Sequence, residues 1–185
     1  MIPAFRQLSD SIEILGVGSR SLEKAAAFCE EHDAGKPMSY EEMLKSDADA
    51  FYVPLPSGVR NDFIRKSIQE GKHIYSEKPH SGSVSELRDL VLSCEKNGLQ
   101  WIDGTMWYHS NRTLEIAEKR IESVGQVKRV TASFTWGPGL VDEEWVNGGN
   151  GRTDPSREPF GMLGDSGHYP ISAVLWAYQF ELPTR

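Results

Sequence analysis

The sequence has few cysteines, no long hydrophobic run and no excess of positive charge, and each absence excludes a class of protein. Cys29 and Cys94 are the only cysteines, each in a helix-like stretch, so a disulfide-stabilised scaffold is not expected and the thiols are predicted to be reduced. No apolar run approaches the roughly 20 residues that cross a membrane, and residues 1–10 lack the apolar core of a signal peptide. A net charge of −7 makes nucleic acid and anionic membrane surfaces poor candidate partners. We therefore expect a cytoplasmic protein.

Motifs for metal binding and for nucleophilic catalysis are also missing. The chain has no Gly-x-Ser-x-Gly sequence of the kind that presents a catalytic serine. The histidines are scattered, and none pairs with another histidine or a cysteine at the spacing of metal ligands: His32, His73, His80, His109 and His168. No bound metal is expected.

What the chain does contain is an alternation of short apolar segments with segments of helical periodicity. This alternation indicates a parallel sheet whose strands are joined by right-handed helical crossovers, so the predicted fold class is α/β. One expected helix has a capping box, because Ser83 stands three residues before Glu86. The expected strands are residues 12–18, 49–56, 72–79 and 99–107, and the expected helices are 21–32, 58–71, 83–97 and 110–125.

The pattern changes near residue 125. Residues 126–136 alternate apolar with polar side chains, as an antiparallel strand with one solvated face does. Residues 137–160 are rich in Gly, Pro, Asn and Asp and predict a long loop, and 164–180 predict a loop that turns into an apolar helix. We expect a first domain with a Rossmann-like parallel sheet and the beginning of an α+β domain with an antiparallel sheet, residues 1–125 and 126–185.

The segment "HIYSEKP" places Glu77, Lys78 and Pro79 where a buried strand ends. In open parallel sheets, ligands bind beyond the carboxyl ends of the strands. A lysine held in a partly dry crevice there can transfer protons, and the proline that follows fixes the local backbone, with a cis peptide accessible at the Lys-Pro bond. Taken alone, the tripeptide also fits a solvated ion pair on a surface turn.

Six blocks occur in an order and spacing that resemble one enzyme family: "GVGSRSLEKAAAF", "DAFYVPLPSG", "GKHIYSEKP", "DGTMWYHSNRT", "GQVKRV" and "GDSGHY". They resemble the Gfo/Idh/MocA oxidoreductases, and among these most closely the dihydrodiol-dehydrogenase-like and plant-type branch. The resemblance implies that Lys78 lies near nicotinamide and substrate and assists proton transfer. In "GDSGHY", Asp165 matches the family pattern, whereas Tyr169 stands where many relatives have histidine, and a tyrosine hydroxyl can also relay a proton.

The residues after "GVG" favour NADP over NAD, although NAD stays possible. An acidic residue usually accepts the ribose hydroxyls here, but this chain has Ser19 and Arg20, with Lys24 one turn into the helix. A hydroxyl, a guanidinium and a helix amino end together suit a 2′-phosphate. The alternative is that Ser19 or Ser21 only caps the helix and Arg20 is solvated.

Other contacts are implied by the resemblance. Arg60 replaces a histidine of many relatives, so any contact of that histidine is in question. For Leu55, Pro56 and Ser57 the open alternative is a turn with a good helix cap. For the substrate end, the open alternatives are core packing of Met106 and Trp107, helix capping by Asp165 and burial of Tyr169. The cofactor's diphosphate and nicotinamide end are expected at Leu55, Pro56, Ser57, Glu77, Lys78 and Pro79, and the substrate at Trp107, Tyr108, His109, Arg112 and Asp165.

The implied function is hydride transfer between NADP(H) and a secondary alcohol or carbonyl of a sugar, polyol or diol, in a full-length form expected to be a homo-oligomer. The largest departure from the family is the start "MIPAFRQLSD", which resembles the far end of the first helix, without the first strand and the Gly-x-Gly-x-x-Gly turn. The resemblance implies that the other end is short as well, because family members continue through an antiparallel sheet that covers the active site. We therefore expect a fragment whose own activity is doubtful. The alternative is a non-catalytic, truncated family member that serves as a binding or interaction module.

Overall fold

All strand pairs of the described residues are parallel, and they form two small sheets. The computed structural model describes residues 1–80, 82–119, 125–135, 154–182 and 184. The first sheet pairs β1 (Gly16–Gly18) with β2 (Lys36–Met38); the second has the order β3 (Ala50–Val53), β4 (His73–Ser76) and β5 (Trp101–Asp103). Parallel strands with intervening helices confirm the predicted α/β class.

Seven α-helices lie within the described residues, and serines begin several of them. The side chains of Ser21, Ser39 and Ser83 each accept a hydrogen bond from the backbone amide three residues later, which satisfies an amide that the helix leaves unpaired. The predicted cap at Ser83 is therefore confirmed. The helices are α1 (Ile2–Arg6), α2 (Leu22–His32), α3 (Tyr40–Leu44), α4 (Ser57–Gln69), α5 (Val84–Lys96), α6 (Asn111–Lys119) and α7 (His168–Ala177).

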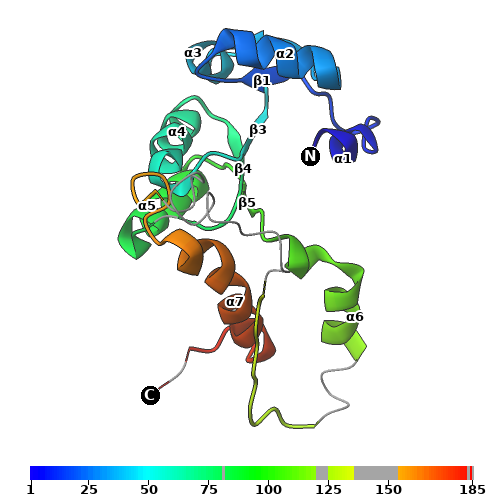
Figure 1. The fold of residues 1–185 in the computed structure, drawn as a ribbon, viewed down its shortest axis with the longest axis vertical. Coiled ribbons are helices and arrows are strands. Elements are labelled where there is room, and N and C mark those ends of the chain that lie inside the picture. Colours follow the sequence, from blue (N-terminus) through cyan, green and yellow to red (C-terminus); the bar gives the residue numbers. More distant parts are fainter. Residues whose placement is uncertain (81, 120–124, 136–153, 183, 185) are drawn as a thin grey trace.

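The main core lies between the second sheet and the helices α4 and α5. Phe51 of β3, Ile74 of β4 and Ile64 of α4 are each at most 1% exposed. Figure 1 shows α4 and α5 beside β3, β4 and β5, with β1, α2 and α3 at one end of the molecule and α6 and α7 toward the other. Tyr40 of α3 contacts Phe63 of α4, so the core continues toward the first sheet.

Three features differ from the sequence-based expectations. The strands are shorter than predicted, and β2 and α3 were not predicted. For β2 the reason is that a three-residue strand containing Pro37 carries almost no periodic signal. The predicted strand over residues 126–136 is wrong for 125–135, which form no strand. Alternation only makes a segment suited to a sheet, and a strand needs a hydrogen-bonded neighbour, which the described residues do not supply here.

Two observations concern the disulfide-stabilised and membrane-spanning classes of protein. Cys29 and Cys94 are both buried and free. In the part of the chain that the structure describes, no helix combines the length and apolar character needed to cross a membrane.

Candidate active site

Lys78 lies two residues beyond the end of β4 and is held by Asp165, 87 residues further along the chain. Its Nζ atom lies 2.7 Å from Oδ1 of Asp165 and donates a second hydrogen bond of 3.1 Å to the Asp165 carbonyl. The two side chains are only 12% and 9% exposed. A pair this dry does not behave as a solvated surface pair, because its charges depend on each other for compensation. The surface-turn interpretation of Lys78 is therefore wrong.

Asp165 reaches Lys78 from a π-helical turn, Leu163–Gly167, that leads into α7. Such turns widen a helix by one residue and often occur at functional sites. Gly167, not Asp165, is the N-cap residue of α7, so the capping role considered for Asp165 is not observed. Tyr169 lies one turn further, with its ring centroid 5.0 Å from Nζ of Lys78. The ammonium of Lys78 therefore contacts both the carboxylate of Asp165 and the ring face of Tyr169.

The backbone around Lys78 is anchored to the neighbouring strands. The Lys78–Pro79 peptide bond is cis. The Glu77 amide donates to Val53 at the end of β3, and the Gly104 amide donates to Ser76 at the end of β4. A Cβ atom on residue 104 would come within 2.9 Å of the Ser76 carbonyl oxygen, so glycine permits this close approach. The carboxyl ends of β3, β4 and β5 therefore meet at Lys78.

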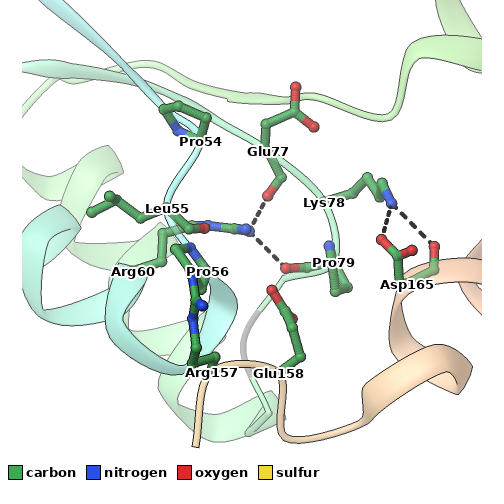
Figure 2. Close-up of a pocket in the computed structure, with 10 residues that line it drawn as sticks. All are labelled: Pro54, Leu55, Pro56, Arg60, Glu77, Lys78, Pro79, Arg157, Glu158 and Asp165. Atoms are coloured by element: carbon green, nitrogen blue, oxygen red, sulfur yellow. Dashed lines mark hydrogen bonds and ion pairs between the residues drawn. The ribbon is translucent and has the colours of Figure 1, made fainter. Parts of the chain in front are cut away.

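Glu77 turns its carboxylate toward β3, where the Tyr52 hydroxyl donates a 2.8 Å hydrogen bond to it. Burial, and then this bond to a carboxylate, raise the pKa of Tyr52, so the phenol remains a donor at neutral pH. The arrangement holds the Glu77 side chain away from the ammonium of Lys78, as Figure 2 shows.

Arg60 of α4 is almost completely buried, at 3% exposure, beneath the same turn. Its Nε donates to the Leu55 carbonyl over 2.7 Å, and one terminal nitrogen donates to the carbonyls of Glu77 and, over 2.7 Å, Pro79. Figure 2 shows the guanidinium reaching between the β3 and β4 turns. Burial lowers the pKa of Arg60, while the carboxylates of Glu158 and Glu77 act in the opposite direction.

A cavity of about 300 Å³ opens beside these residues, and two segments far apart in the sequence, 54–79 and 157–165, contribute to it. Glu158 sits over the start of α4, where its carboxylate accepts hydrogen bonds from the amide and the hydroxyl of Ser57. A carboxylate is favoured there by the unpaired amides of a helix amino end. The cavity is lined by Pro54, Leu55, Pro56, Arg60, Glu77, Lys78, Pro79, Arg157, Glu158 and Asp165 (Figure 2).

A second polar cluster lies at the end of β5. Asp103 Oδ2 is 3.1 Å from Nε2 of His80, and Asp103 Oδ1 accepts a 2.7 Å hydrogen bond from the Thr105 amide. Burial alone would raise the pKa of Asp103, but the contacts with His80 and Thr105 outweigh it and lower that pKa. The Thr105 hydroxyl lies 3.0 Å from Nε2 of His168, whose pKa is lowered by burial. Through Asp103, Thr105 and His168, this cluster connects the end of β5 to the start of α7.

The residues predicted for the adenosine end lie apart from this cavity. Ser19 and Arg20 directly follow β1, at the end of the molecule that carries the first sheet (Figure 1). The Ser21 side chain caps α2 and Ser19 Oγ accepts the Ser21 amide, so the helix amino end is formed as expected. Arg20 and Lys24 are exposed. Their contact with a phosphate stays a prediction.

The aromatic residues predicted to line a substrate pocket pack against α7 instead of the cavity. The Trp107 indole nitrogen donates to the Ser172 hydroxyl over 3.2 Å, and its ring contacts Trp176. Tyr108 contacts Phe180. His109 and Arg112 are exposed. The packing alternative, made for Met106 and Trp107, fits Trp107 but not Met106, which is 65% exposed. A substrate role for the four candidates stays a prediction.

Sequence reasoning missed Asp103, His80 and Glu158. A signal existed for Asp103, because it is a polar residue at the carboxyl end of a parallel strand, the position used to select Lys78. Glu158 had no such signal, since it lies in a non-periodic segment 101 residues from its partner Ser57.

Parallel strands joined by helices, with a buried lysine at the carboxyl edge and a cavity beside it, define an α/β protein of the nucleotide-binding kind. The family model for GFO_IDH_MocA, described as an oxidoreductase family with an NAD-binding Rossmann fold, matches residues 1–104. The chain therefore belongs to the Gfo/Idh/MocA oxidoreductase family, which confirms the resemblance seen in the sequence.

Relatives from three organisms extend this result. The chain is 31% identical to D-xylose 1-dehydrogenase (NADP(+)) 2 of Haloferax volcanii, over 94% of the chain and 51% of the relative. It is 31% identical to trans-1,2-dihydrobenzene-1,2-diol dehydrogenase of Xenopus laevis, over 66% and 38%. A crystal structure from Desulfitobacterium hafniense superposes with a TM-score of 0.78 over 95% of this chain and 51% of that one, and at 20% identity it shows the fold alone. The chain spans about half the length of the first curated relatives it matches.

Proposed function

We propose that this chain forms part of an NADP(H)-dependent oxidoreductase that transfers a hydride between nicotinamide and a secondary alcohol or carbonyl of a sugar, polyol or diol. The observation that carries the proposal is the buried Lys78–Asp165 pair at the carboxyl end of β4, in a family of oxidoreductases. The names of the Haloferax and Xenopus relatives support the sugar and diol classes, and the former also supports NADP. In this proposal residues 1–125 belong to the dinucleotide-binding domain and 126–185 begin the substrate domain.

The chemistry assigned to Lys78 follows from its hydrogen bonds. An ammonium has three N–H donors, and Asp165 accepts from two of them in the described residues, which leaves the third for a substrate oxygen. Bound nicotinamide would supply or accept the hydride. During carbonyl reduction, Lys78 donates a proton to the oxygen as the C–O π bond breaks, and during alcohol oxidation the neutral amine accepts that proton. Tyr169 is proposed to assist through its hydroxyl, and Asp165 holds the ammonium in place.

Residues at two places fit the two ends of NADP(H). Ser19, Arg20 and Lys24 surround the amino end of α2, and a hydroxyl with two cationic side chains suits the 2′-phosphate. Leu55 and Pro56 line the cavity beside Lys78, where the nicotinamide end is proposed to lie. The glycine turn that holds a pyrophosphate in Rossmann folds is not contained in residues 1–185. The diphosphate contact expected at Leu55, Pro56 and Ser57 stays a prediction, and the amide and hydroxyl of Ser57 already donate to Glu158.

The test is Lys78→Ala in the full-length protein, assayed by NADPH oxidation against a panel of keto-sugars and diketones. General acid-base groups contribute about 10²–10⁴-fold, so we expect turnover to fall by that factor while calorimetry finds NADPH affinity nearly unchanged. Removing one partner of a buried pair also destabilises the fold, by about 3–5 kcal/mol, so circular dichroism must show that the variant is folded at the assay temperature. Near-normal turnover by the variant would remove Lys78 from this role. If the unmodified full-length protein reduced none of the substrates in the panel, the result would favour the alternative of a non-catalytic binding module.

A further inference from the structure

From the geometry beneath the cavity, we infer that Arg60 is the positioning residue that sets the place of Lys78 in the active site, by fixing the backbone on both sides of that lysine. The inference rests on the proposed function, in which Lys78 transfers the proton. Arg60 itself points under the turn and is not given a role at the reacting atoms.

The hydrogen bonds of Arg60 meet at the peptide units that flank Lys78. One terminal nitrogen donates to the carbonyl of Glu77, the residue before the lysine, and to that of Pro79, the residue after it. The Nε atom donates over 2.7 Å to Leu55, on the turn that follows β3. A single planar group therefore joins the exits of two adjacent strands and spans the lysine (Figure 2).

The burial of Arg60 indicates that this contact is specific. At 3% exposure, the guanidinium has given up nearly all of its hydration, and only fixed acceptors can replace it. Three backbone carbonyls do so, together with the fields of Glu77 and Glu158. Arg60 is the fourth residue of α4, and Phe63 and Ile64 on the next turn lie in the core, so the helix that carries Arg60 is fixed by core packing.

The consequence for Lys78 is geometric. Its Nζ atom must meet the carboxylate of Asp165 at 2.7 Å and must also reach a substrate oxygen, so small movements of the turn change both distances. The turn has hydrogen bonds to β3 through the Glu77 amide, and the Glu77 carbonyl accepts from Arg60 and, over 3.3 Å, from the Ser76 hydroxyl. The Pro79 carbonyl accepts from Arg60. Loss of Arg60 would leave the Glu77 carbonyl with the longer bond from Ser76, remove the donor to Pro79 and let the turn rearrange.

The experiment uses three variants of the full-length protein. Arg60→Met keeps the length of the side chain and removes every donor. Arg60→Lys keeps the charge, but one ammonium cannot span from Leu55 to the carbonyls of both Glu77 and Pro79, and this variant serves if the methionine variant does not fold. Arg65→Met is the matched control, because Arg65 lies on the same helix with a side chain 46% exposed in pairs with Asp62 and Glu86.

The first readout needs no activity. Each protein is acetylated with a limiting amount of acetic anhydride, and mass spectrometry gives the ratio of modification at Lys78 to that at Lys72. Lys72 is a suitable internal reference, since it precedes β4 at the opposite end and its Nζ donates a 2.7 Å hydrogen bond to the Ser46 carbonyl. We expect the ratio to rise severalfold in Arg60→Met, less in Arg60→Lys, and not at all in Arg65→Met. A general loss of stability would raise labelling at both lysines and leave the ratio unchanged.

The second readout is kinetic. A displacement of about 1 Å in a catalytic group costs on the order of 10²-fold in rate, so kcat should fall about 10- to 100-fold in Arg60→Met while KM for NADPH stays within about threefold. An unchanged labelling ratio would overturn the positioning role, and so would a raised ratio with unchanged kcat. If the unmodified full-length protein turned over no substrate, the proposed function would fail, yet the labelling ratio would still decide whether Arg60 positions Lys78.

Discussion

At the scale of single residues, the site is governed by charged groups that are compensated in different ways. Lys78 and Asp165 compensate each other, whereas Arg60 is compensated mainly by backbone carbonyls. Asp103 is held ionised by its contacts with His80 and Thr105. Each charged group has its own partners, so a substitution at one of them should affect either activity or the pH dependence of stability without necessarily affecting the other.

The first prediction at this scale concerns Arg20. In the full-length protein, Arg20→Ala should weaken NADP binding more than NAD binding, because only NADP carries the 2′-phosphate that an exposed guanidinium after β1 can contact. A charge-assisted contact is worth about 1.5–3 kcal/mol, which corresponds to a tenfold or larger change in Kd. Calorimetry with both cofactors measures it. Equal losses for NADP and NAD would assign Arg20 to a feature that the two share.

The second concerns His168. Burial lowers the pKa of His168 below its ordinary value of 6.5, so between the two pKa values the unfolded chain binds more protons than the folded one. Stability from the neutral ring is therefore complete above pH 6.5 and is lost as the pH falls toward and through the folded-state pKa. The groups around the ring are Asp103, His80, Lys78 and Asp165.

Thermal unfolding from pH 8 to pH 5 tests this, with His168→Asn expected to flatten the decline in the melting temperature below about pH 6.5. His32→Asn is the control substitution, because that side chain is 40% exposed and lies on α2, away from the cluster around His168. If His168→Asn merely shifted the whole curve downward without changing its slope, the titration of His168 would not be the cause.

At the scale of elements, the site is made by bringing a segment from the carboxyl-terminal third against the start of α4. The Gly58 amide donates to the Arg157 carbonyl over 2.8 Å, while Glu158 accepts from Ser57. A Cβ atom at position 58 would lie 2.3 Å from the Ser156 carbonyl oxygen. The absence of a side chain at Gly58 is therefore what allows residues 156–158 to close one wall of the cavity.

Gly58→Ala should consequently detach this wall even though alanine is the better helix former by about 1 kcal/mol. The clash involves backbone oxygens, which cannot move as a flexible side chain does, so we expect it to outweigh the gain in helix propensity. Hydrogen exchange of the residue-58 amide should accelerate, because its acceptor, the Arg157 carbonyl, moves away. Unchanged exchange at residue 58, with a raised melting temperature, would show that the segment tolerates the methyl group.

At the scale of the whole molecule, the parallel strands fall into two separate sheets. The described residues supply no strand that hydrogen-bonds both β1 and β3, so each sheet has edges with unpaired backbone groups. Phe5 of α1 contacts Tyr52 of β3, and α3 packs against both β1 and the main core, so side-chain contacts connect the two parts. Ser19 and Arg20, the candidates for the adenosine end, therefore follow a strand of one sheet and Lys78 follows a strand of the other. No strand of the described residues forms backbone hydrogen bonds with both sheets.

For that reason a polypeptide of residues 1–185 alone is expected to bind NADP poorly, to show no dehydrogenase turnover and to self-associate. Unpaired sheet edges favour association between chains, and the pyrophosphate has no glycine-turn amides to bind in this sequence. Calorimetry and sedimentation on the purified polypeptide measure both properties. Micromolar NADP affinity in a monomer would mean that another segment holds the phosphates.

The sequence by itself determined three of the helices and the principal catalytic candidate. Helical periodicity located α2, α4 and α5, with serine caps at α2 and α5, and the apolar run before Glu77 placed Lys78 at a strand end. These are local properties that follow from neighbouring residues. The same local reasoning failed for residues 126–135, where alternation did not bring a partner strand, and for the three-residue β2, where too few residues carry the pattern.

Only the tertiary structure decided what surrounds Lys78. Asp165 lies 87 residues from Lys78 along the chain, and Glu158 lies 101 residues from Ser57, so no local pattern encodes either contact. The role of Arg60 likewise depends on acceptors that β3 and β4 provide only when they lie side by side. The reason is physical: propensity and periodicity act over one or two turns, whereas the compensation of a buried charge depends on whichever groups the fold brings to it.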